Sequence, residues 1–216
     1  MLNSNLVGND VRKAVVDGWP VQNIIASDIE EGGSSPLAGE LADFLVMITG
    51  FWKCGHDLFK STPETFPAVF IPGDIFQSEF LKTRPPFYAK PLEIHPALQS
   101  LTRSLTPMQG HISAIHASSF FHLFNEERQL EVAQRLASLL SPSKGSVIFG
   151  SQVAHPEKGW HGLDEDVKLF CHSPESWKEL WNQVFEGGTV DVVADLRTID
   201  TTERRFYFLW WSVTRT

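Results

Sequence analysis

Two aspartates stand where an open α/β sheet displays groups that bind a nucleoside. Asp28 follows an apolar stretch at 21–26 and lies 20 residues after Gly8, the spacing of a carboxylate that accepts hydrogen bonds from ribose hydroxyls. Asp74 follows a second apolar stretch, and its carboxylate could accept from the exocyclic amine of adenine while Ile75 packs on the ring. The alternatives are a helix N-cap for Asp28 and a turn aspartate for Asp74.

His116 and His122 belong to a stretch, 110–124, that changes character half-way along. Residues 111–117 are small or β-branched for the most part, which is typical of a strand buried on both faces of a parallel sheet. Because ligands lie at the carboxyl ends of such strands, 117–122 is where chemistry would be displayed. Either histidine could act as a general base, and the alternative is a hydrogen-bonded structural residue.

The elements that must position these residues alternate between strand and helix. Gly8 precedes one of the helices, where a helix N-terminus can receive a polar or anionic ligand group; a simple turn is the alternative. A long loop at 152–168 carries Trp160, and loops of this length are usually functional or mobile. We predict strands at 21–26, 68–71, 111–117 and 146–150, helices at 11–16, 92–105 and 125–140, a helix that opens at 173 and ends at 187, and a terminal antiparallel hairpin of strands 190–199 and 205–213.

Composition limits the partners that we expect. The chain has 216 residues, of which 42% are hydrophobic, enough for one domain with a proper core. The formal net charge is −8 and Lys and Arg form no cluster, so neither nucleic acid nor a membrane is an expected partner. The two cysteines, Cys54 and Cys171, lack paired spacing, which predicts a reducing, cytoplasmic location without a disulfide or a metal site.

The order of elements and five local motifs together resemble one enzyme family. The order, with its antiparallel last strands, is similar to that of class I S-adenosylmethionine-dependent methyltransferases. The motifs resemble the fungal small-molecule branch of that family, whose members modify meroterpenoids and other secondary metabolites. The resemblance implies an α/β, Rossmann-like sheet that is mostly parallel and ends in an antiparallel β-hairpin. The motifs are Gly8–Lys13, Val21–Asp28, Phe70–Phe76, Ala114–Phe124 and His172–Trp177.

Roles for individual residues follow from this resemblance. It implies S-adenosyl-L-methionine as the cofactor, with the side chains of 117–118 near its sulfonium. It also implies that a small-molecule acceptor lies beside the aromatic residues that follow. In this sequence, Gly8 would face the methionine part, Asp28 and Ile29 the ribose, Asp74 and Ile75 the adenine, Ala117 and Ser118 the sulfonium, and Phe121, His122 and Trp160 the acceptor.

Two departures from the family pattern shape the predicted architecture. The family's first strand and its acidic Gly-rich motif would precede Gly8, yet only seven residues stand there and none is acidic. We therefore expect the first strand to be truncated or missing, and an inserted segment at about 32–49. The rest of 1–216 is expected to form a single methyltransferase-like domain.

The function predicted from the sequence is methyl transfer from S-adenosylmethionine to a hydroxyl or carboxyl of a secondary metabolite. One alternative is a catalytically impaired or inactive remnant of a methyltransferase. A second is a nicotinamide-dependent reductase, although such an enzyme needs a G-x-G-x-x-G turn that this sequence lacks. The acceptor, the methylated atom and the oligomeric state stay open.

Overall fold

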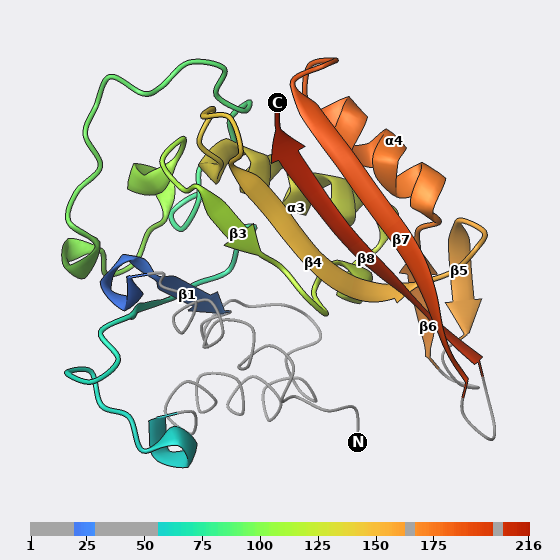
Figure 1. The fold of residues 1–216 in the computed structure, drawn as a ribbon, viewed down its shortest axis with the longest axis horizontal. Helices are drawn as coiled ribbons and strands as arrows, with labels where there is room; N and C mark the ends of the chain where they lie inside the picture. The colour runs from blue at the N-terminus through green and yellow to red at the C-terminus, as the bar shows by residue number, and fades with distance from the viewer. Residues whose placement is uncertain (1–19, 29–55, 163–166, 201–204) are drawn as a thin grey trace. The chain divides into compact units, whose positions relative to one another are not determined.

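The computed structural model describes residues 20–28, 56–162, 167–200 and 205–216 (Figure 1). The chain divides into two compact units, one of residues 1–81 and 96–107 and the other of residues 82–95 and 108–216. Within the described ranges, no helix combines the length and the apolar character that crossing a membrane requires.

The first unit contains a two-stranded parallel sheet. Strand β1 (Ile25–Asp28) pairs with β2 (Val69–Pro72), and the register places Ile25 opposite Val69. The strand predicted at 68–71 is thus confirmed within one residue, whereas β1 begins later than predicted. A 3-10 turn, η1 (Val21–Asn23), precedes it, and its Asn23 N–H donates to the carbonyl of Pro20 at 2.9 Å. Proline and asparagine both favour turns, which explains the shift.

The prediction of a helix at 92–105 was wrong. The structure has only a short 3-10 turn there, η2 (Leu98–Ser100), followed by a second, η3 (Thr106–Met108). Pro96 disfavours helical backbone at the residue before it, so the apolar spacing could not form one helix. The apolar residues of the first half stay in solvent: Leu92 is 101% exposed and Ile94 is 92% exposed.

The second unit is built on a four-stranded mixed sheet (Figure 1). Its first pair of strands is parallel and its other two pairs are antiparallel, so the predicted α/β class and the terminal antiparallel hairpin are confirmed. The stretch predicted as a strand at 111–117 forms only a three-residue strand, which lies at one edge of the described sheet. In spatial order the strands are β3 (Ala114–His116), β4 (Val147–Ala154), β8 (Arg205–Arg215) and β7 (Val190–Asp200).

Two helices cover one face of this sheet, α3 (Glu126–Leu139) and α4 (Pro174–Val184) (Figure 1). Asn125 caps α3 by accepting from the Arg128 N–H, as its place in the sequence predicted. Ser173 opens α4 in a capping box, with proline at the first helical position. Local capping signals therefore set where both helices start.

An aromatic cluster forms the core between these helices and the sheet. Trp177 and Trp181 of α4 are fully buried, and Trp211 of β8 is 4% exposed. The ring of Phe121, from the 3-10 turn η4 (Phe121–Leu123), lies 4.9 Å from Trp177 and 5.6 Å from Trp211. Edge-to-face contacts of this kind add stability beyond the buried area. They fix η4 against the sheet.

The stretch predicted as a long loop at 152–168 contains strand residues in its described part. Strand β4 runs on to Ala154, and β5 (Gly159–Gly162) pairs antiparallel with β6 (Lys168–Cys171). Four residues bounded by glycines give too short a pattern to indicate a strand. The hydrogen bonds that make β5 a strand come from β6, which lies further along the chain.

Candidate functional site

The structure brings the two predicted aspartates to the same edge of the first unit's sheet. Asp28 is the last residue of β1 and lies opposite Pro72, the last residue of β2. Asp74 follows Pro72 by two residues, and Ile75 comes next. The carboxyl ends of parallel strands meet at one edge, and ligands of open α/β sheets bind there.

The Asp74 carboxylate also stabilises its own turn. Its Oδ1 accepts from the Phe76 N–H at 2.9 Å, and the Asp74 carbonyl accepts from the Gln77 N–H at 3.0 Å. A carboxylate has two oxygens with several acceptor positions, so this turn leaves it able to accept from a ligand. The ring of Phe80 covers the turn, and an added Cβ on Gly73 would stand 2.1 Å from it.

Four predictions lie outside the described residues. Two concern the cofactor-site residues Gly8 and Ile29, and two concern the inserted segment at about 32–49 and the truncated first strand. These stay predictions.

In the second unit, the loop after β3 lies directly on the backbone of β4. The Ala117 N–H donates to the carbonyl of Phe149 at 2.9 Å, and the Ser119 N–H donates to the carbonyl of Ser151 at 2.7 Å. Gly150 stands between them, and a Cβ there would lie 2.1 Å from the carbonyl oxygen of Ala117. Only glycine permits this approach.

Ser119 has a φ of +54°, which is uncommon for a residue with a side chain. Such strain costs of order 1–3 kcal/mol, persists only where surrounding contacts enforce it, and clusters at functional sites. The contacts of Ala117 and Ser119 with β4 hold this loop in place.

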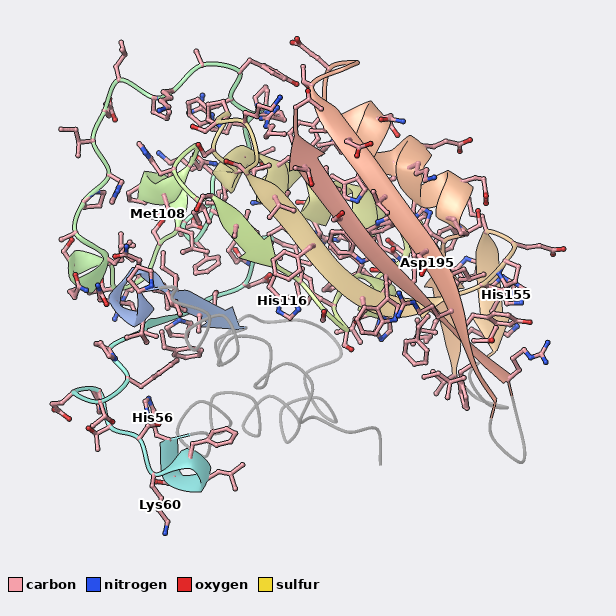
Figure 2. The ribbon with its side chains drawn as sticks, viewed as in Figure 1. His56, Lys60, Met108, His116, His155 and Asp195 are labelled. Atoms are coloured by element: carbon pink, nitrogen blue, oxygen red, sulfur yellow. The ribbon has the colours of Figure 1, made fainter. Side chains whose placement is uncertain are left out.

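His116 and Ser118 form a hydrogen-bonded pair at the carboxyl end of β3, where Figure 2 shows His116. The His116 Nε2 lies 2.8 Å from the Ser118 Oγ, which also accepts from the Ser151 N–H at 3.0 Å. The imidazole packs beside the Phe149 ring at 5.0 Å. The structure thus brings together two predicted site residues, one from the catalytic set and one from the cofactor set.

His122 lies in η4 and is half-buried. Its Nδ1 is buried and has no hydrogen-bond partner in the described part of the chain. Burial lowers the pKa of His122 to about 4, because the charged imidazolium would lose its hydration. At neutral pH the ring is therefore uncharged, and it is a weaker base than an exposed histidine.

The two aromatic residues predicted to face an acceptor differ in exposure. Phe121 is fully buried in the tryptophan cluster, whereas Trp160, on β5, is 59% exposed. The Trp160 ring packs edge-on against Phe170 of β6 at 5.6 Å, and β6 contacts η4. Trp160 is therefore the member of the pair that offers a free ring face.

Gln129 is a positioning residue that the sequence analysis missed. It is fully buried in α3, and its Nε2 donates to the carbonyls of Phe124 and Phe170, each at 2.9 Å. These bonds tie the end of η4 to β6. The available signal was a polar residue within the apolar face of a helix, because a buried amide needs partners.

Comparison with known proteins finds that the chain is similar in sequence to fungal methyltransferases. The chain is 28% identical over 181 residues to the O-methyltransferase phiE of a fungal species (Fungal sp.), covering 82% of this chain and 46% of phiE. The chain is a relative of fungal methyltransferases. It is 25% identical to the methyltransferase adrK of Penicillium rubens, covering 83% of this chain and 50% of adrK. It is 26% identical to the asnovolin E/chermesin D methyltransferase nvfJ of Aspergillus novofumigatus, covering 82% of this chain and 49% of nvfJ.

These similarities confirm the resemblance that was predicted from the sequence. The chain spans about half the length of the curated relatives it matches. No family model matches it. A crystal structure of the Burkholderia thailandensis 1,6-didemethyltoxoflavin-N1-methyltransferase, with 1,6-didemethyltoxoflavin and S-adenosylhomocysteine bound, overlaps with a TM-score of 0.48. That overlap has 9% identity and covers 98% of this chain and 88% of the other. This structural similarity is too low to support any statement about the site.

Proposed function

We propose that the chain transfers a methyl group from S-adenosylmethionine to a hydroxyl or carboxyl oxygen of a small-molecule secondary metabolite. The observation that carries this proposal is the similarity to fungal methyltransferases, which extends over 82% of the chain for phiE and 83% for adrK. A nicotinamide-dependent reductase has no comparable support. A catalytically impaired relative of these enzymes is the remaining alternative.

The two aspartates of the first unit fit the donors of an adenosyl group. Ribose hydroxyls and the adenine amine both donate hydrogen bonds, and carboxylates accept them. In this proposal Asp28, with Ile29, holds the ribose, and Asp74, with Ile75, frames the adenine. Their common place at the ends of β1 and β2 supports the assignment. Gly8 keeps its proposed role beside the methionine part.

The second unit supplies the residues proposed to lie near the reacting atoms. When bound, the cofactor supplies a methyl group that its sulfonium has already activated. Ala117 and Ser118 would hold that end in line with the acceptor, and alignment of this kind can account for much of the rate. The rigid contact of their loop with β4 supports the assignment.

The acceptor decides whether a base is needed. A carboxylate acceptor carries no proton, so its oxygen forms the new bond to carbon while the bond from carbon to sulfur breaks. A hydroxyl acceptor must also lose its proton, and His116 or His122 is the proposed base. With a pKa of about 4, His122 is unprotonated at neutral pH but is the weaker base that such a low pKa implies. Trp160 would contact the body of the acceptor, with Phe121 supporting the site from the core.

Titration calorimetry with S-adenosylhomocysteine on the purified chain tests this proposal. We expect saturable binding at one site, with a dissociation constant of about 1–100 μM, within the ordinary range for enzyme ligands. NADPH at the same concentrations serves as the control and should give no saturable heat. If the chain does not bind S-adenosylhomocysteine at 1 mM, a concentration on the order of the weakest affinities usual for enzymes, this proposal fails. The catalytically impaired relative is then the alternative that remains. Binding of NADPH alone would favour the reductase.

A further inference from the structure

A cavity of about 600 Å³ lies in the second unit, and the residues of the loop that follows β3 are not part of its wall. Its walls come from the start of α3, the side of α4 and the hairpin of β5 and β6. A volume of this size suits a small organic molecule. The side chains that line the cavity indicate which kind of molecule it suits.

The charged side chains around the cavity are predominantly acidic. Glu126 and Glu127 stand at the start of α3, and Glu179 stands on α4. Lys158 is the one basic residue in the wall, and its Nζ lies 2.5 Å from a carboxylate oxygen of Glu126. In the described part of the chain, Glu127 and Glu179 have no ion-pair partner. Two negative charges are thus left to attract a cation.

His172 lines the cavity with an unsatisfied nitrogen. It is 2% exposed, and its Nε2 has no hydrogen-bond partner among the described residues. Two charges act on the imidazole, those of Lys158 and Glu126, and both side chains belong to the cavity wall. The imidazole therefore lies in the wall at the charged end of the cavity, and its Nε2 is buried behind that wall.

The hydrogen bonds of Ser176 are compatible with the ring proton of His172 on either nitrogen. The His172 Nδ1 lies 2.9 Å from the Ser176 Oγ, which also accepts from the Ser173 N–H at 3.0 Å. The same hydroxyl lies 3.3 Å from the Ser173 carbonyl oxygen. If the Ser176 hydroxyl donates to the Ser173 carbonyl, Nδ1 carries the ring proton and Nε2 the lone pair. If the hydroxyl donates to Nδ1, Nε2 carries the proton.

The remaining wall combines the uncharged polar residues Asn125, Ser176 and Gln183 with an apolar surface. Trp160 presents a ring that is 59% exposed, beside Phe170, and two leucines continue the surface. Exposed indole faces attract cations through the quadrupole of the ring. The wall therefore suits a ligand in which a positive charge is attached to an apolar body.

We propose that this cavity binds a protonated amine carried on an aromatic or aliphatic body. The ammonium lies between Glu127 and Glu179, beside the imidazole of His172, and the apolar body packs on Trp160. The proposal concerns binding only and does not rest on methyl transfer, although Trp160 is shared with the proposed acceptor contact.

Three probes of one shape and different charge test this proposal: 2-phenylethylamine, 2-phenylethanol and phenylacetate. The readout is the indole N–H signal of Trp160 in the ¹⁵N-labelled full chain, assigned by its loss in Trp160→Phe. We expect the amine to shift this signal saturably, with an affinity roughly tenfold above that of the alcohol. Phenylacetate should bind more weakly still.

Substitution of the carboxylates provides the second arm of the test. In Glu127→Gln/Glu179→Gln, affinity for the amine should fall roughly three- to tenfold, because exposed ion pairs are screened by solvent and each contributes little. Glu175→Gln is the matched control, because Glu175 is exposed on the same helix outside the cavity wall. Equal affinity for amine and alcohol, preference for phenylacetate, an unchanged double variant, or no saturable shift would each overturn the proposal.

Discussion

At the scale of single residues, Asp74 shows how one side chain can serve a turn and a ligand. The sequence left both roles open. The structure assigns the Oδ1 to the Phe76 N–H, which is the turn role, at the edge where β1 and β2 end. The two roles use different acceptor positions of one carboxylate, so they are compatible and can be separated by substitution.

We predict that Asp74→Asn weakens S-adenosylhomocysteine binding by roughly tenfold, because a charge-assisted hydrogen bond contributes about 1.5–3 kcal/mol. The amide oxygen can still accept from the Phe76 N–H, so the melting temperature should change little. Calorimetric titration and thermal unfolding of the same samples measure both effects. Undiminished binding in Asp74→Asn would refute the adenine assignment, because the turn stays intact in that variant.

At the scale of elements, the loop after β3 depends on its contact with β4. Backbone hydrogen bonds on both sides of Gly150 hold Ala117 and Ser119 against that strand. The positive φ of Ser119 is maintained by the same contacts. The loop that we propose to align the reacting atoms is therefore positioned by a neighbouring strand as well as by its own sequence.

We predict that Gly150→Ala destabilises the chain by roughly 1–3 kcal/mol, the usual cost of overpacking. The added Cβ would stand 2.1 Å from the Ala117 carbonyl oxygen, and a backbone atom cannot move aside alone. Gly187→Ala is the control, because no atom lies within 4 Å of the Cβ it would add. Urea unfolding measures both. If the two variants have the same free energy of unfolding, the loop after β3 moves to accommodate the added Cβ at little cost.

At the scale of the whole molecule, the lowered pKa values of His122 and His172 make the free energy of unfolding depend on pH. Burial lowers the pKa of His122 to about 4; burial, helped by Lys158, does the same for His172. In the unfolded chain both return to the ordinary value of about 6.5. Between these values the unfolded state binds more protons than the folded state, so stability falls as the pH is lowered from about 6.5 towards 4.

We predict a loss of up to about 1.4 kcal/mol per pH unit for each histidine across this window. Urea unfolding between pH 7.5 and pH 4.5, roughly spanning the window, should show the decline. His122→Gln/His172→Gln removes both groups and should flatten the profile. A double variant with the same slope as the wild type would mean that other groups cause the pH dependence.

Local signals in the sequence were enough to determine a large part of this protein. Asn125 and Ser173 set the starts of α3 and α4 through short-range caps. The alternating apolar pattern and the intervening turn defined the terminal hairpin, because such patterns act within one element. The strand ends that carry Asp28 and Asp74 were also identified correctly from the sequence.

The tertiary structure decided what depends on distant partners. The hairpin of β5 and β6 exists because its two strands pair, and neither strand has a strong pattern alone. Phe121 is core because three tryptophans from other elements enclose it, and His172 has a low pKa because packing removes its water. Burial and pairing of this kind arise between segments far apart in the chain, so no local pattern records them.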